Sequence, residues 1–170
     1  MVIRQERLTD HDIIYEVIKT SFLKAEHADG KEQDLAAMLR ESEAYLPELS
    51  LVAEVDGTVA GHVLFTEAKV GEQKVLALAP LSVLPEYQRK GIGTALVKEG
   101  HRIGKELGYS YSVVLGSEKY YPRFGYVPAN QFGIRPPFDV AEENFMAVKL
   151  NAAAPLLNGT LRYAREFGID

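Results

Sequence analysis

Three stretches of the chain carry apolar residues at the spacing of an amphipathic helix. The first follows Thr9, which can cap a helix with Asp12 at its third position, and the second spans residues 35–39. The third spans residues 92–107, where basic side chains such as Lys98 lie off the apolar stripe. The pattern therefore predicts three helices. Their apolar faces are Ile13, Ile14, Val17, Ile18 and Phe22 in the first, Leu35, Met38 and Leu39 in the second, and Ile92, Ala95, Leu96, Ile103 and Leu107 in the third.

Apolar runs bounded by turn residues predict the strands. Asp56-Gly57 separates two such runs and is a strong signal for a two-residue hairpin, and a second hairpin is expected near Gly71-Glu72. The continuous apolar run at residues 111–115 is typical of a buried strand. The predicted strands cover residues 2–7, 51–55, 59–65, 74–83, 111–115, 144–150 and 159–163.

The order of these elements predicts an α+β fold. Hairpins come first, and a single strand–helix–strand crossover then makes the strands at residues 74–83 and 111–115 parallel. We expect a mixed, mainly antiparallel sheet of six to seven strands flanked by helices, in one domain over residues 1–170. A ligand should bind at the carboxyl ends of the two parallel strands, just after Val83.

Composition and charge exclude several classes of function. The net charge of −5 and the pI near 5.4 argue against nucleic acid as a partner and mildly favour a cationic, amine-bearing one. The chain has no cysteine, which excludes disulfides, a cysteinyl zinc site and a cysteine thioester. No metal site is expected. No secretory signal pattern follows Met1, and the longest nearly apolar run, residues 75–84, is too short to cross a bilayer. We expect a cytoplasmic protein without a membrane partner.

A basic, glycine-bearing turn joins the strand at residues 74–83 to the third helix. N–H groups at a helix N-terminus have no partner within the helix, and the helix dipole adds positive charge there, so the turn is suited to an anion. Two glycines let a phosphate approach the backbone without a Cβ in the way. The residues of the turn are Gln88, Arg89, Lys90, Gly91, Ile92, Gly93 and Thr94.

The spacing in this turn distinguishes among phosphate-binding motifs. A P-loop sequence is missing, and Gly91-Ile92-Gly93 lacks the third glycine of a dinucleotide fingerprint. What remains is Gln-x-x-Gly-x-Gly, at Gln88, Gly91 and Gly93. This spacing resembles the pyrophosphate-binding turn of the GNAT superfamily, the acyl-CoA-dependent N-acetyltransferases.

A second string supports the resemblance. Residues 113–126 read as a buried strand, a cap, one helical turn and a return, with an aromatic pair ahead of a Gly-aromatic step, as at the end of the GNAT core. The similarity continues through residues 132–139 and 143–147, near the YhbS-like predicted N-acetyltransferases. It is specific from about Leu51 to Leu150. The chain is identified as a member of the GNAT superfamily, which implies the acyl-CoA N-acyltransferase fold and acetyl-CoA as cosubstrate.

Pro80 interrupts a predicted central strand, because proline has no N–H for the ladder. Either the strand has a β-bulge here or its pairing with a neighbour ends. In GNAT proteins two strands separate at this point and the pantetheine amides pair with the exposed backbone. The resemblance therefore implies cofactor contacts at Leu81, Ser82 and Val83, with the backbone of Leu81 and Val83 as partners. It also implies cofactor contacts along the turn at residues 88–94, and one at Ser117, where relatives often carry Asp.

Acetyl transfer to an amine needs a proton for the departing thiolate. Tyrosine suits this role because its proton stays on at neutral pH. Tyr121 stands four residues before Gly125, which is the spacing of the family's acid, whereas Tyr120 should point about 100° away around the same helical turn. We therefore expect Tyr121 to be the catalytic acid. The hydroxyl of Ser117 can cap this turn.

The sequence does not identify the group that accepts the proton from the amine. A backbone N–H of the strand at residues 81–83 is expected to polarise the thioester carbonyl, but this strand carries no carboxylate from residue 77 to residue 83. A water relay or an already neutral amine is an alternative to a side-chain base. The candidate side chains are Glu54, His62 and Glu67 on the strands, with His62 as a half-buried, hydrogen-bonded imidazole, and His27, Glu32 and Asp34 in or beside the polar segment at residues 25–31.

The sequence thus favours an N-acetyltransferase that moves an acetyl group from acetyl-CoA to a primary amine by direct attack in a ternary complex. The alternative is a non-catalytic acyl-CoA-binding sensor or regulatory module, which would need the same turn but not Tyr121. A nucleotide-binding protein unrelated to CoA is disfavoured by the missing motifs. The acceptor, a small molecule or a peptide, stays open, as does the oligomeric state, a homodimer included.

Overall fold

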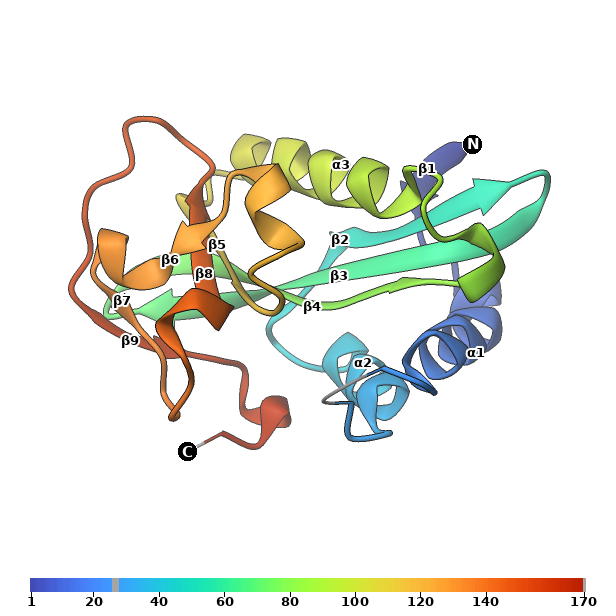
Figure 1. Ribbon diagram of the computed structural model, residues 1–170, viewed down its shortest axis with the longest axis horizontal. Helices are drawn as coiled ribbons and strands as arrows, with labels where there is room; N and C mark the ends of the chain where they lie inside the picture. The colour runs from blue at the N-terminus through green and yellow to red at the C-terminus, as the bar shows by residue number, and fades with distance from the viewer. Residues whose placement is uncertain (26–27, 170) are drawn as a thin grey trace.

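The structure, a computed structural model, describes residues 1–25 and 28–169. Within these residues, three α-helices flank one mixed sheet (Figure 1). The helices are α1 (His11–Phe22), α2 (Glu32–Arg40) and α3 (Ile92–Glu106). The strands are β1 (Val2–Gln5), β2 (Tyr45–Val55), β3 (Thr58–Val70), β4 (Gln73–Val83), β5 (Tyr111–Leu115), β6 (Val127–Pro128), β7 (Ile134–Arg135), β8 (Phe145–Lys149) and β9 (Gly159–Arg162).

The sheet confirms the predicted fold class. Its main order is β1-β2-β3-β4-β5-β8-β6, and β9 pairs with β3 and β7 away from this path. Among the strands in the described part of the chain, only β4 with β5 and β7 with β9 are parallel, so the sheet is mainly antiparallel. The two strands that the sequence did not indicate, β6 and β7, have two residues each, which is too short for a hydrophobic pattern. The expected six to seven strands correspond to the longer ones.

The helices cover both faces of the sheet. In Figure 1, α3 lies on one side of the long strands and α1 and α2 lie on the other. The α3 side buries Leu96 and Val97 against Phe65, and the opposite side buries Ile14 and Leu39 with other residues of α1 and α2. A third apolar cluster lies around β5, β8 and β9. The long strands β3 and β4 therefore run through the middle of the core.

Both predicted hairpins are present. Asp56 and Gly57 join β2 to β3 with φ angles of 49° and 80°, as a two-residue turn with positive φ at both positions requires. Gly71, with φ of 61°, lies in the connection from β3 to β4. Local turn chemistry thus sets the register of the three central strands.

The start of α1 differs from the prediction. Leu8–Asp10 form a 3₁₀ turn and the helix begins at His11, so Thr9 does not cap it. The carboxylate of Asp10 instead accepts hydrogen bonds from the Arg7 backbone N–H, at 2.7 Å, and from the Arg4 guanidinium, at 2.7 and 3.1 Å. Asp10, and not Thr9, accepts these hydrogen bonds because its ionised side chain forms charge-assisted hydrogen bonds that are stronger than those of a threonine hydroxyl.

Three residues of the predicted apolar faces are exposed, and one of them, Leu107, is 42% exposed and follows the last residue of α3. Ile13 on α1 and Met38 on α2 are 44% and 50% exposed, although their neighbours Ile14 and Leu39 are buried. Adjacent residues on a helix point about 100° apart, so only one of each pair can face the sheet. The predicted helices are right, but their buried faces are narrower than the sequence indicated.

Strand β4 leaves β5 halfway along its length. The two strands pair only over Leu76–Leu78, whereas β4 stays paired with β3 as far as Val83. Against β3 the register shifts between the pairs Leu78–Phe65 and Leu81–Val63, so Ala79 and Pro80 form an irregularity in β4. Both readings of Pro80 are therefore correct, because the ladder bulges on one side and ends on the other.

His101 is half-buried between α3 and the sheet and stays neutral there. Its Nε2 atom is 2.9 Å from the Tyr126 hydroxyl, and its ring packs edge-on against Phe65. Burial lowers the pKa of His101 from 6.5 to about 4. Between these pH values the unfolded chain binds a proton that the folded chain does not, so stability falls as the pH falls.

Replacing this histidine should therefore make the free energy of unfolding depend less on pH below pH 7. Between pH 7 and pH 4 the wild type should lose about 3 kcal/mol more than His101→Gln in free energy of unfolding. Urea titrations at both pH values for both proteins measure the difference. Parallel losses in the two proteins would show that His101 titrates normally in the folded chain.

Candidate active site

The glycine-bearing turn begins where β4 ends. After Val83 the chain makes a 3₁₀ turn at Pro85–Tyr87, and α3 begins at Ile92. Gly91 precedes the helix with φ of 84°, and Arg89 also adopts a left-handed conformation, with φ of 64°. Residues other than glycine rarely adopt this conformation, and such backbone strain is found preferentially at functional sites. The turn thus leads into the first N–H groups of α3, which have no partner within the helix.

The side chains of the turn surround that helix end with positive charge. Arg89, Lys90 and Gly91 are exposed, and the Lys90 ammonium lies 5.6 Å from the centre of the Tyr87 ring. The Gln88 side chain donates a hydrogen bond to the Val83 carbonyl, at 3.1 Å, and so ties the turn to the end of β4. Ile92 and Gly93 are buried and Thr94 is half-buried. An anion at this position would meet two cations and the positive end of α3.

The segment Leu81–Val83 forms an open edge beside the turn. It pairs with β3 on one side, and β5 has already separated on the other. Leu81 and Val83 are half-buried, whereas Ser82 is 2% exposed and its hydroxyl has no hydrogen-bond partner. The structure therefore places this open edge beside the turn at residues 88–94, which we call the anion turn.

The two neighbouring tyrosines lie at different parts of this site. A Cβ on Gly93 would collide with the hydroxyl of Tyr120, and a Cβ on Gly116 would collide with the ring of Tyr121. Tyr120 thus lies against the turn, contrary to the expectation that its hydroxyl points elsewhere. The sequence signal for this contact was Gly93 itself, since a glycine inside a helix often marks the close approach of another part of the chain. The helical turn starts at Tyr121, and Tyr120 precedes it with non-ideal angles.

Tyr121 is held in an apolar aromatic cluster. Its ring contacts those of Tyr120, Phe124 and Tyr126 edge-on, with centres 5.1, 6.3 and 5.7 Å apart. Burial raises the pKa of Tyr121 well above its usual value, and Tyr120 adds to the effect. The hydroxyl therefore keeps its proton at neutral pH, as a proton donor must.

Ser117 caps the turn that presents these tyrosines, as predicted. Its hydroxyl accepts a hydrogen bond from the Lys119 N–H, at 3.1 Å, and its carbonyl accepts from the N–H groups of Tyr120 and Tyr121. The side chain is exposed. Arg123 lies over the Tyr120 ring, 4.4 Å from its centre, and adds a cation to this end of the site.

Most of the candidate bases have other partners. Glu54 pairs with the Arg4 guanidinium at 3.2 Å, and Glu67 accepts a hydrogen bond from the Tyr109 hydroxyl at 2.7 Å. Asp34 accepts from the Tyr15 hydroxyl at 2.8 Å, and Glu32 from the Asp29 N–H at 2.9 Å. His27 lies outside the residues that the structure describes.

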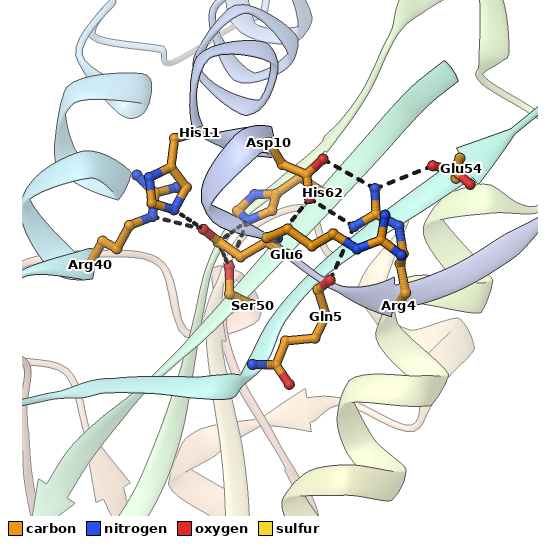
Figure 2. A network of polar contacts seen from close by, with 10 residues as sticks. Arg4, Gln5, Glu6, Asp10, His11, Arg40, Ser50, Glu54 and His62 are labelled. Carbon is orange, nitrogen blue, oxygen red and sulfur yellow. Dashed lines mark hydrogen bonds and ion pairs between the residues drawn. The ribbon is translucent and has the colours of Figure 1, made fainter. Parts of the chain in front are cut away.

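His62 is fully buried, not half-buried as expected, because it joins a polar network that the sequence did not reveal. Figure 2 shows this network around the carboxylate of Glu6. Arg40 Nε lies 2.8 Å and His11 Nε2 lies 3.0 Å from one carboxylate oxygen. The other oxygen accepts from the Ser50 hydroxyl and lies 3.6 Å from His62 Nε2.

Glu6 is ionised in this network. Burial by itself would raise the pKa of Glu6, but the neighbouring His62, Ser50 and Arg40 side chains stabilise the carboxylate, outweigh the effect of burial and lower the pKa to about 2. The five residues come from the loop after β1 and from α1, α2, β2 and β3. No local pattern joins positions so distant in the chain, so the sequence held no signal for Glu6.

The described residues contain no cluster of three or more His, Cys, Asp or Glu side chains that could hold a metal ion. Among the same residues, no helix combines the length and the apolar character needed to cross a membrane.

Comparison with known proteins identifies the family of the chain. A model of the Acetyltransferase (GNAT) family matches residues 12–126. The chain therefore belongs to the GNAT family.

Individual relatives agree with this assignment. The chain is 39% identical over 142 residues to YjhQ of Escherichia coli K12, described as an uncharacterized N-acetyltransferase, over 79% of this chain and 78% of that one. It also resembles the crystal structure of YhbS from E. coli in complex with CoA, with a TM-score of 0.84, 29% identity and coverage of 98% and 91%. A GNAT acetyltransferase from Brucella melitensis in complex with acetyl-CoA gives a TM-score of 0.81, 32% identity and coverage of 98% and 97%. The predicted resemblance to YhbS-like proteins is confirmed.

Proposed function

We propose that this protein transfers an acetyl group from acetyl-CoA to a primary amine by direct attack within a ternary complex. The observation that carries the proposal is the joint position of three features: the open edge of β4, the anion turn at the start of α3, and the half-buried, protonated Tyr121. Two similar proteins were crystallised with CoA or acetyl-CoA, which supports the choice of cosubstrate.

Each part of the site would have one task. The N–H groups at the start of α3, with Arg89 and Lys90, would hold the pyrophosphate. The backbone of Leu81 and Val83 would pair with the pantetheine amides, and an N–H of this segment would donate to the thioester oxygen as negative charge develops. Tyr121 would give its proton to the departing thiolate.

A turnover screen tests the proposal against the alternative of a non-catalytic acyl-CoA sensor. Acetyl-CoA is incubated with the protein and a panel of polyamines, aminoglycosides, amino acids and peptides, and thiol release is measured. The proposal predicts thiol release that depends on at least one amine, with an N-acetylated product of matching mass. Tight binding of acetyl-CoA without turnover on any amine would favour the sensor.

Direct attack predicts a particular kinetic pattern. Because the chain has no cysteine, no thiol is present to carry the acetyl group covalently. Initial rates plotted against both substrates should give intersecting lines, and intact mass after incubation with acetyl-CoA alone should be unchanged. Parallel lines together with a gain of one acetyl group on a pocket residue would show a ping-pong route instead.

A further inference from the structure

Two buried polar atoms on neighbouring strands have no hydrogen-bond partner. They are Nδ1 of His62 and the hydroxyl of Ser82, on side chains that are only 1% and 2% exposed. His62 on β3 and Ser82 on β4 are directly opposite each other in the antiparallel pair. Such residues point to the same face of the sheet, with Cβ atoms about 5 Å apart. An unpaired polar atom in a core is costly, so two at one place indicate a function.

The hydrogen bonds around His62 determine which ring nitrogen carries the proton. The Ser50 hydroxyl has one proton and donates it to the Glu6 carboxylate, which is ionised and cannot donate in return. Towards His62 Nε2, 3.0 Å away, the Ser50 oxygen must therefore accept (Figure 2). The proton is on Nε2, and Nδ1 has a free lone pair. Nδ1 is thus a buried proton acceptor without a partner.

The position of Ser82 relates this acceptor to the proposed reaction. Ser82 lies between Leu81 and Val83, in the segment of β4 from which β5 has separated. On the other face of the sheet, Leu81 and Val83 pack in the same cluster as Tyr121. The proton donor for the thiolate and the free acceptor on His62 therefore lie on opposite sides of the open edge.

We propose that His62 accepts, through Nδ1, the proton that the attacking amine loses, and that the Ser82 hydroxyl and a bound water carry it there. This inference rests on the proposed function and names the base that acts in it. The amine nitrogen forms a bond to the acetyl carbon as the bond from that carbon to sulfur breaks. The amine proton passes to His62, and Tyr121 gives a proton to the sulfur. Solvent then returns one proton to Tyr121 and removes one from His62.

The surroundings of His62 suit this task. Burial lowers the pKa of His62 below its usual range and the Glu6 carboxylate offsets part of this effect, so the ring is neutral at pH 7. When Nδ1 takes up a proton, Glu6 stabilises the imidazolium from 3.6 Å. The other titratable or charged groups of the network are Arg40 on α2, His11 on α1 and Tyr45 on β2. Glu6 and Ser50 thus have a positioning role like that of the third member of a catalytic triad.

The test compares His62→Gln with His101→Gln, on the amine that the wild type acetylates fastest. The glutamine amide at residue 62 can still donate to Ser50 but cannot take up a proton, whereas His101→Gln makes the same change at a histidine of α3 that pairs with Tyr126. Loss of the base should lower kcat by about 10², while the KM for acetyl-CoA stays within about twofold and His101→Gln stays near the wild-type rate. Ser82→Ala should cost about tenfold in kcat.

The pH dependence separates a base from a merely structural histidine. The ratio of the wild-type to the His62→Gln rate cancels the ionisation of the amine. This ratio should be constant above pH 6.5 and should fall in more acid solution, as His62 takes up a proton. A ratio near one, or one that does not vary with pH, would overturn the inference and leave the acetyltransferase itself intact. A wild type without turnover on any amine would instead refute the proposed function.

A measurement on the wild type covers the case in which His62→Gln fails to fold. Long-range ¹H–¹⁵N NMR of protein with labelled histidine reports which ring nitrogen is protonated. The inference predicts a neutral His62 with its proton on Nε2. A proton on Nδ1 would overturn it.

Discussion

Tyr121→Phe should lower kcat by a factor of about 10² while the affinity for CoA barely changes. The substitution keeps the ring in the aromatic cluster with Tyr120, Phe124 and Tyr126 and removes only the proton donor. Burial keeps this hydroxyl protonated at neutral pH. The loss should therefore appear in the chemical step. Rates on one amine acceptor across a pH series, under conditions in which chemistry limits turnover, measure it.

Tyr120→Phe is the matched control, because it makes the same change one residue away. The Tyr120 hydroxyl lies against Gly93 at the start of α3, so its loss should weaken CoA binding a few-fold, by about 1 kcal/mol, and leave kcat nearly unchanged. Tyr121→Phe should thus mainly lower kcat, and Tyr120→Phe should mainly lower the affinity for CoA. Wild-type rates in Tyr121→Phe would remove Tyr121 from the mechanism, and a larger rate loss in Tyr120→Phe would transfer its role to Tyr120.

Gly91→Val should weaken CoA binding tenfold or more, that is by about 1.4 kcal/mol at least. Gly91 has φ of 84°, which a β-branched residue rarely adopts, so the turn would have to change shape. An open surface surrounds this glycine, since a Cβ there would meet no atom within 4 Å. The effect on binding would therefore come from the turn and the ligand, and not from a clash within the core. Isothermal titration calorimetry with CoA measures it.

Gly57→Val controls for backbone strain. Gly57 lies in the hairpin between β2 and β3 with φ of 80°, and its Cβ would also meet nothing within 4 Å. Both variants should lose similar stability, but only Gly91→Val should lose affinity for CoA. Gly93→Val should weaken binding to a similar degree, because its side chain would displace the Tyr120 hydroxyl as well as approach the phosphate. Unchanged affinity in a folded Gly91→Val protein would exclude this turn as the pyrophosphate site.

The parts of the fold that could be predicted are those that local chemistry decides. Asp56-Gly57 determines its hairpin because few dipeptides adopt positive φ at both positions, and Pro80 marks the end of the β4–β5 ladder because it lacks an N–H. The turn before α3 follows from its glycines and cations. In each case the residues that decide the structure are neighbours in the chain.

The parts that could not be predicted depend on contacts between distant residues. The Glu6 network joins positions 6, 11, 40, 50 and 62, and only the folded sheet brings them together. The same contacts bury His62 more deeply than its place on a strand indicated. The direction of Tyr120 was missed because the helical turn starts one residue later, at Tyr121, so the angle of an ideal helix did not apply. Local rules place Tyr121 and the turn, but not His62.

A crystal structure of the protein with CoA tests the central claim most directly, because it shows whether the open edge, the turn and Tyr121 form one site. The account predicts pyrophosphate oxygens on the N–H groups at the start of α3, and pantetheine amides paired with the backbone of Leu81 and Val83. It also predicts the CoA sulfur within hydrogen-bond distance of the Tyr121 hydroxyl. A CoA molecule bound elsewhere, or a sulfur out of reach of Tyr121, would contradict it.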